Sequence, residues 1–201
     1  MVKPLTGSEI LENLKMLSDW LQVKHPGDHF ELIVVGGAVM ALDGFKEQTT
    51  DIDLLRPEVL PDSIVDGIVH IGRVKRLGPQ WLNTNVADML LKVKGSSELP
   101  EYFNEISRTI EVSDNLKIGL IGRQALISLK MYAATPSYSK HTVDIKNLRP
   151  NKEEISEAVR FVLSIDNTNP RKDDLRVVLE DIEFNFDEIH SKLAKKDKCS
   201  H

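Results

Sequence analysis

Two aspartates stand one residue apart in the apolar segment TTDIDLLR, at positions Asp51 and Asp53. Side chains alternate along a β-strand, so both carboxylates would project from one face while Ile52 and Leu54 turn towards the core. Two negative charges on one face repel each other unless a divalent cation joins them. Because carboxylate oxygens suit Mg²⁺ or Mn²⁺, the pair predicts a metal site.

Two adjacent glycines, Gly36 and Gly37, end the apolar segment HFELIVVGG that precedes the acidic pair. A residue without a Cβ lets the backbone approach a ligand, and free N–H groups at a helix start attract anions. Thirteen residues separate Gly37 from Asp51, enough for a short helix and a reversal that returns the next strand beside the first. Each feature alone is ordinary, but their order and spacing together predict one ligand, a nucleotide with its metal.

The stretch VVGGAVMALDGFKEQTTDIDLL resembles the signature of the nucleotidyltransferase superfamily, in which two small residues precede Asp-x-Asp on the next strand. It is most similar to the AbiEii-like, minimal nucleotidyltransferase branch. A second stretch, QALISLKMYAATPSYSKHTVDIKNL, is similar to the later motif of that branch, with Lys130 at the lysine position and Asp144 at the second aspartate. The two stretches cover about a quarter of the chain.

The resemblance implies transfer of a nucleotidyl group from a nucleoside triphosphate to a hydroxyl of RNA or protein, with Mg²⁺ or Mn²⁺ and with pyrophosphate leaving. Asp51 and Asp53 would hold the metal, Gly36 and Gly37 would cradle the phosphates, and Lys130 would contact them as a point charge. The resemblance also implies the toxin component of a toxin–antitoxin system, with an antitoxin protein as partner.

The chain departs from the family pattern at two places. Relatives often carry an arginine a few residues before the first aspartate, where this chain has Lys46, Glu47 and Gln48. The later motif has His141 where an aspartate is usual. We expect Asp144 either to take part in the site or to pair on a helix.

The third carboxylate of active relatives has one candidate, Asp88 in the segment NVADMLLKV. A strand there would place Asp88, Leu90 and Lys92 on one face, and the alternative is an ordinary surface residue. Two other functions stay open. One is a catalytically degenerate module that binds nucleotide or a partner, and the other is a glycosyltransferase with a metal-binding DxD, which the upstream glycines disfavour.

The elements around these motifs predict an α/β (α+β) fold, a nucleotidyltransferase-like mixed sheet with flanking helices and a C-terminal helical lobe. Apolar residues at helical spacing indicate a helix over 7–23, with Thr6 and Glu9 as a capping box. The segments between Ile64 and Val93 are interpreted as strand or mixed structure, and Trp81 between them as an anchor of its turn. NLKIGLIG predicts the last strand.

The pattern becomes helical after Gly122, with three helices around RQALISLKMYAA, KEEISEAVRFVLSI and the segment after Asn169 and Pro170. We therefore expect an α/β lobe over residues 1–122 and a helical lobe over 123–201.

Composition limits the classes of function. A formal net charge of −5 argues against broad DNA binding. The single cysteine, Cys199, cannot form an intrachain disulfide, and the first residues lack the pattern of a signal peptide. No apolar run reaches the roughly 20 residues that span a bilayer, so we expect a cytoplasmic protein without a membrane partner.

Overall fold

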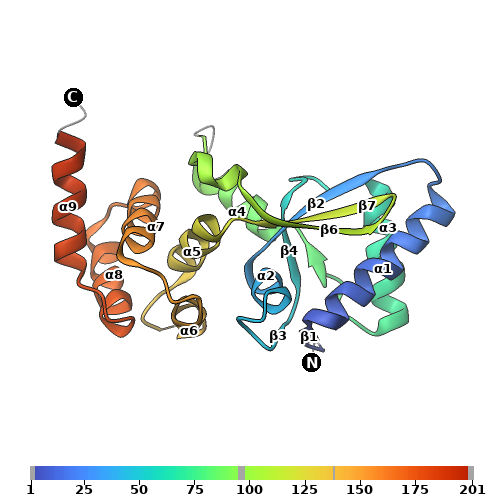
Figure 1. Ribbon diagram of the computed structural model, residues 1–201, viewed down its shortest axis with the longest axis horizontal. Coiled ribbons are helices and arrows are strands. Elements are labelled where there is room, and N and C mark those ends of the chain that lie inside the picture. Colours follow the sequence, from blue (N-terminus) through green and yellow to red (C-terminus); the bar gives the residue numbers. More distant parts are fainter. Residues whose placement is uncertain (1–2, 95–97, 138, 199–201) are drawn as a thin grey trace. The chain divides into compact units, whose positions relative to one another are not determined.

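The computed structural model describes residues 3–94, 98–137 and 139–198, and Cys199 lies outside them. The chain divides into two compact units (Figure 1). The sheet unit comprises Met1–Glu98 and Asn104–Gly122. The helical unit comprises Leu99–Phe103 and Arg123–His201, so a short stretch ahead of the last two strands belongs to the second unit.

A five-stranded mixed sheet with flanking helices forms the sheet unit, which confirms the predicted mixed α/β class. Its strands follow the order β5-β4-β2-β7-β6. Antiparallel pairs join β2 to β4 and β6 to β7, while β2 with β7 and β4 with β5 are parallel. The strands are β2 (Phe30–Val35), β4 (Ile52–Arg56), β5 (Leu82–Asn83), β6 (Ile106–Ser113) and β7 (Leu116–Ile121). Two short strands, β1 (Leu5–Thr6) and β3 (Gln48–Thr49), pair separately.

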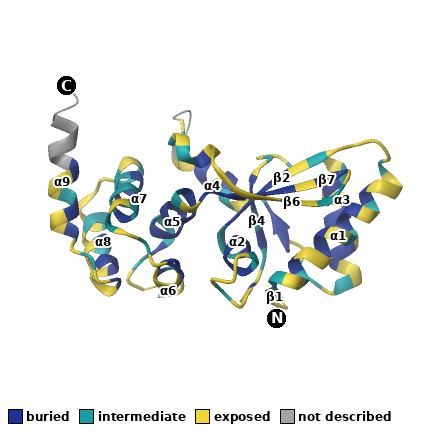
Figure 2. Ribbon diagram, viewed as in Figure 1, coloured by how far each residue is buried: buried dark blue, intermediate teal, exposed yellow. Residues whose placement is uncertain are grey.

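The helices of this unit pack against the sheet and against each other. They are α1 (Gly7–Lys24), α2 (Gly36–Leu42), α3 (Asp62–Lys75) and α4 (Asn85–Lys94). The predicted capping box at the start of α1 is confirmed, because the Thr6 side chain accepts from the Glu9 backbone and the Glu9 side chain accepts from the Thr6 backbone. α2 and α4 pack against β4, and α1 packs against α3. In Figure 2, β2, β4 and β7 are largely buried, whereas the edge strand β6 is largely exposed.

The interpretation of residues 64–93 as strand or mixed structure is wrong, since α3 and α4 occupy most of this range. Ile64, Ile68 and Ile71 are buried at helical spacing, so these isoleucines line one face of α3. Gly67 lets α3 approach α1, because a Cβ there would lie 2.4 Å from Leu17 Cδ1.

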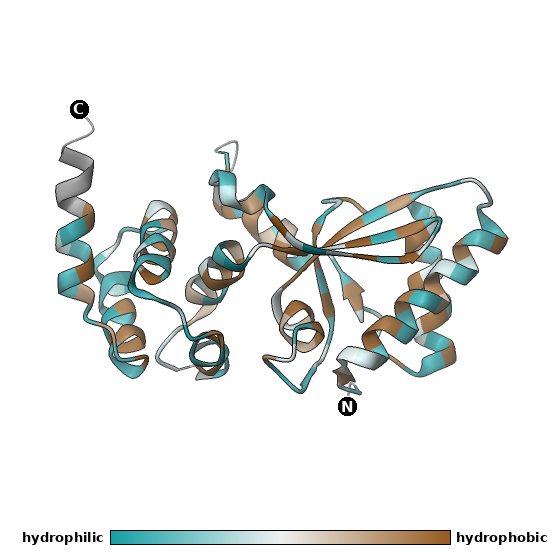
Figure 3. Ribbon diagram, in the orientation of Figure 1, coloured by the Kyte–Doolittle hydropathy of each residue, from teal (hydrophilic) through white to brown (hydrophobic). Residues whose placement is uncertain are grey.

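The helical unit contains α5 (Arg123–Ala133), α6 (Ser139–Leu148), α7 (Lys152–Ile165), α8 (Asn169–Asp181) and α9 (Phe186–Lys198). The three predicted helices correspond to α5, α7 and α8. Pro170 lies in the first turn of α8, as predicted, and the N-cap is Thr168. The helices present apolar residues on one side and polar residues on the other (Figure 3). A 3₁₀ turn, Glu101–Asn104, brings Phe103 into this core, where its ring centroid lies 5.0 Å from that of Phe161.

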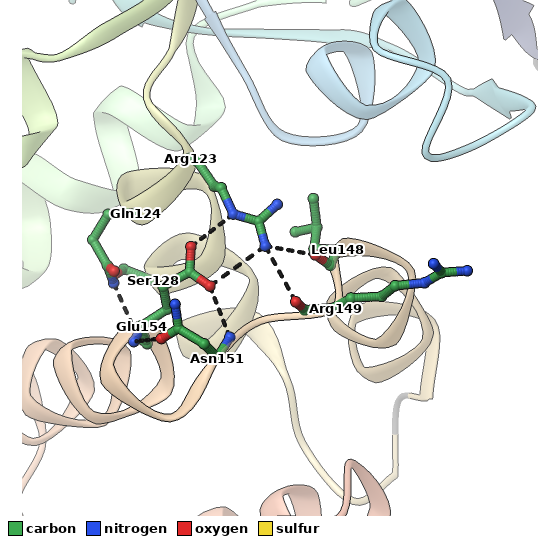
Figure 4. A network of polar contacts seen from close by, with 7 residues as sticks. All are labelled: Arg123, Gln124, Ser128, Leu148, Arg149, Asn151 and Glu154. Carbon is green, nitrogen blue, oxygen red and sulfur yellow. Dashed lines mark hydrogen bonds and ion pairs between the residues drawn. The ribbon is translucent and has the colours of Figure 1, made fainter.

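Arginines complete the ends of two helices in this unit. Arg171 donates to the carbonyls of Met131, Tyr132 and Ala134 at the end of α5. Arg123 donates to the carbonyls of Leu148 and Arg149 at the end of α6 (Figure 4). Both guanidinium groups therefore satisfy carbonyls that helix geometry leaves without intrahelical partners.

Within the described residues, none of the helices combines the length and the apolar character needed to cross a membrane.

Candidate functional site

The strand-to-helix turn between β2 and α2 lies beside the acidic strand β4. Val35 pairs with Asp53 across the antiparallel ladder, so Gly36 follows directly at the point where β2 ends. Gly36 has φ +70, a conformation that L side chains rarely adopt. A Cβ at this position would lie 3.2 Å from Asp53 Oδ2. The fold therefore brings the first glycine and one of the predicted metal ligands into contact.

Gly37 packs against a different residue, Thr49. A Cβ here would lie 2.4 Å from Thr49 Oγ1, a distance that no real Cβ tolerates. Thr49 is buried and belongs to β3, which precedes the acidic pair. Glycine at position 37 is thus favoured by close packing against Thr49, whose Cβ would also lie 3.2 Å from the added Cβ.

The acidic pair shows the alternation that the sequence predicted. Ile52 and Leu54 are fully buried, whereas Asp51 and Asp53 are half-buried. Asp53 lies within β4 and Asp51 immediately precedes it, where Thr50 Oγ1 donates a hydrogen bond of 3.1 Å to Asp51 Oδ1. Both carboxylates are partly open to solvent, as ligands of an exchangeable ion must be.

The carboxylates near the glycines fit a Mg²⁺ site better than a calcium or zinc cage. No group of three His, Cys, Asp or Glu residues able to hold a metal ion occurs within the described part of the chain. Calcium sites and structural zinc sites are commonly cages of several protein ligands. Two carboxylates beside a glycine turn do fit Mg²⁺, which commonly takes one or two carboxylates and completes its shell with water and phosphates.

The strand beside the acidic pair supplies an amide where a third carboxylate would be useful. Asn83 of β5 pairs with Asp53 in the parallel ladder. Its side chain is committed, because Nδ2 donates to the Gln80 carbonyl and Oδ1 accepts from the Asn85 backbone at the start of α4. Asn83 therefore organises the turn into α4.

The prediction of a strand around Asp88 is wrong, because this segment forms α4. Asp88 lies in the first turn of α4 and is exposed, and in a helix Asp88, Leu90 and Lys92 do not share a face. Leu90 is buried against the core while Lys92 is exposed, as helical geometry requires. Trp81, just before β5, is buried and donates from Nε1 to the Ile68 carbonyl at 3.0 Å, which confirms its predicted role as an anchor.

Lys130 and Asp144 belong to the helical unit, where they form a buried ion pair between α5 and α6. Lys130 Nζ lies 2.6 Å from Asp144 Oδ2, and the two side chains are 6% and 3% exposed. His141 lies half-buried one turn before Asp144 on α6. The contacts of Lys130 and Asp144 with each other account for their burial, and their roles towards a nucleotide stay predictions.

No family model, curated protein or solved structure matches this chain. The geometry of the site therefore carries the functional argument.

Sequence reasoning did not single out Thr49 and Asn83, which surround the predicted site. The signal for Thr49 is its position two residues before the first aspartate, in a segment that must return beside the glycines. The signal for Asn83 was hidden, because its neighbour in the ladder depends on a two-residue strand.

Proposed function

We propose that this protein is a metal-dependent nucleotidyltransferase that moves a nucleotidyl group from a nucleoside triphosphate to a hydroxyl of RNA or protein. The single observation that supports it is the contact between the glycine turn and the acidic strand. Gly36 stands at a left-handed backbone position with the Asp53 carboxylate against it. A phosphate near the glycines and a cation at the carboxylate would then neighbour each other, as they do in a metal–nucleotide complex.

Each residue of the site has a defined task in this proposal. Asp51 and Asp53 hold a divalent cation, which when bound neutralises charge developing on the phosphates. Gly36 and Gly37 begin α2, where backbone N–H groups can bind phosphate oxygens; Gly36 leaves room beside the Asp53 carboxylate, and Gly37 leaves room for Thr49. The acceptor oxygen forms a bond to the α-phosphorus while the bond to pyrophosphate breaks, and the acceptor proton passes to water.

A second candidate function is nucleotide binding without transfer. Asn83 favours it, because this neutral side chain stands beside Asp53 where a carboxylate would help to bind a second ion and accept a proton. The implied toxin role and its antitoxin partner stay part of the proposal through the resemblance alone.

Thermal melting tests the binding step. The wild type and the variant Asp51→Asn/Asp53→Asn are heated with each nucleoside triphosphate, with and without Mg²⁺. A ligand at 100 times its Kd adds about 2.7 kcal/mol to the free energy of unfolding, so we expect a Mg²⁺-dependent rise in Tm for the wild type and none for the variant. Shifts are compared within each protein, because removing two repelling charges changes the stability of the unliganded variant.

Asp66→Asn is the matched control, since it removes an exposed carboxylate of α3 from the same unit. It is expected to keep the Mg²⁺-dependent shift. Transfer of labelled α-phosphate to RNA or protein from a cell extract then separates the two candidates. Binding with transfer supports the enzyme, and binding without transfer supports the second candidate. A preference for nucleotide sugars, or the absence of any Mg²⁺-dependent shift, would contradict both.

A further inference from the structure

The helical unit contains a pocket of about 260 Å³ between the end of α6 and the connection from α8 to α9. Its lining residues are Lys146, Arg149, Pro150, Ile182, Glu183 and Phe184. The volume lies just below the roughly 300 Å³ at which pockets for drug-sized ligands begin. The pocket would therefore enclose only part of a ligand of that size.

Two lining residues hold a backbone conformation that glycine usually adopts. Arg149 has φ 48 and Glu183 has φ 66. Arg149 directly follows α6, and Glu183 lies two residues beyond the end of α8. Helices commonly end with a left-handed residue, but glycine is the ordinary choice there because it carries no Cβ. The ends of α6 and α8 thus each place a long, exposed, charged side chain on the lining of one pocket.

The Arg149 and Glu183 side chains line the same pocket and do not form an ion pair with each other. Among the described residues, neither the Arg149 guanidinium nor the Glu183 carboxylate has a hydrogen-bond or ion-pair partner. Lys146 adds a second cation, with its Nζ 2.9 Å from Asp181 Oδ1. The pocket thus offers donors and an acceptor, separated by room for a ligand.

The backbone of Arg149 is fixed, which sets the direction of its side chain. Its N–H donates to the Lys146 carbonyl at 3.0 Å, and its own carbonyl accepts from Arg123. Figure 4 shows the Arg149 side chain extending away from the network of Arg123 and Glu154. Arg123 therefore holds the backbone of one residue that lines the pocket.

We propose that this pocket binds a mononucleotide. Arg149 and Lys146 would bind its phosphate, since a guanidinium and an ammonium are the ordinary partners of phosphate oxygens. Glu183 would accept hydrogen bonds from N–H groups on the edge of the base. Phe184 is half-buried and offers an apolar ring against which the base can lie. The inference is independent of the acidic pair, because all of these residues belong to the helical unit.

Isothermal titration calorimetry with the four nucleoside 5′-monophosphates tests the proposal. EDTA is present throughout, so that divalent cations do not support binding at Asp51 and Asp53. At least one monophosphate is expected to bind the wild type, and Arg149→Gly is expected to weaken its Kd about tenfold, the loss of one charge-assisted hydrogen bond. Glu183→Gln should also weaken binding, because the acceptor for the N–H groups of the base loses its charge.

Arg76→Gly is the matched control. Arg76 also has a left-handed backbone at a helix end, with φ 56, but caps α3 in the sheet unit and does not line the pocket. Both substitutions give the backbone the residue that it prefers, so neither should lower Tm. The proposal is overturned if no monophosphate binds at about millimolar concentration, or if Arg149→Gly and Arg76→Gly bind alike. Equal binding of inorganic phosphate, or tighter binding of free phenylalanine, would also overturn it.

Discussion

The ion pair of Lys130 and Asp144 joins α5 and α6 through a buried contact. Removing the lysine takes this ion pair away from a buried carboxylate, so Lys130→Met should lower the free energy of unfolding by about 3 kcal/mol. Urea denaturation measures it. Lys140→Met is the control, because Lys140 is exposed on α6, the helix of Asp144, and its loss should cost less than about 0.5 kcal/mol.

The same variant tests the predicted contact of Lys130 with phosphate. If Lys130→Met folds at low temperature and keeps the Mg²⁺-dependent melting shift, the lysine serves structure alone. If the shift is lost while the control keeps it, the lysine serves the nucleotide. A loss of stability equal to that of the control would contradict the importance of the buried pair.

At the level of single residues, local rules predicted the acidic strand but not its surroundings. The alternation of Asp51, Ile52, Asp53 and Leu54 follows from strand geometry and is visible in the sequence. The role of Thr49 depends on how closely β3 approaches α2, which no local pattern encodes. Asp88 looked suitable only because its segment was interpreted as a strand.

The Glu154 carboxylate at the start of α7 accepts from Arg123 of α5, and Arg123 also donates to the Leu148 carbonyl at the end of α6. Burial raises its pKa, but hydrogen bonds from Arg123 and from the Asn151 backbone outweigh burial, and the net pKa lies below the ordinary 4.5. A lowered pKa stabilises the fold above pH 4.5, and this stabilisation disappears as pH falls through the lowered value. The pairing of α5, α6 and α7 is therefore sensitive to acid.

Glu154→Gln keeps the size of the side chain and removes its charge. We expect it to destabilise the protein by about 1 kcal/mol near neutral pH, because the Arg123 hydrogen bonds are no longer charge-assisted. The difference from the wild type should shrink as pH falls, and urea midpoints across an acid pH series measure it. Glu153→Gln, at an exposed neighbour in the same turn, should show no such pH dependence. A constant difference at every pH would contradict the assignment.

The type of an element was predictable where propensity and period agree. In α1, Leu14, Leu17 and Leu21 satisfy both, and its capping box fixes the start. In α3, Ile64, Ile68 and Ile71 carry a helical period in β-branched residues, so composition favours strand while tertiary packing favours helix. The polar segment of α6 buries only a narrow face and depends on α5 for its stability.

At the scale of the whole chain, Phe103 links the path of the sequence to the division into units. It is buried in the helical unit against Phe161, although strands of the sheet unit follow it. Phe103→Ala should therefore destabilise the helical unit by about 3 kcal/mol. Amide hydrogen exchange is expected to accelerate in α7 while β2 and β7 keep their protection.

Phe45→Ala is the control, because Phe45 is 39% exposed in the sheet unit. It should change exchange little in either unit. Equal acceleration in α7 and β7 after Phe103→Ala would show that the two units unfold as one.

The predicted boundary at Gly122 used the change from strand to helix patterns, which is a local signal. The membership of Leu99–Phe103 in the helical unit depends on contacts with residues far along the chain, such as Tyr102 with Ser128. Hydrophobic spacing in five residues cannot indicate such a partner.

Because Leu99–Phe103 belongs to the helical unit, the backbone passes from one unit to the other three times. A single protease cut after Gly122 would leave the amino-terminal fragment with a segment inserted in the core of the carboxy-terminal fragment. The nicked protein should therefore migrate as one species on a native gel and as two under denaturing conditions. Covalent continuity between Gly122 and Arg123 is then dispensable for keeping the two units together.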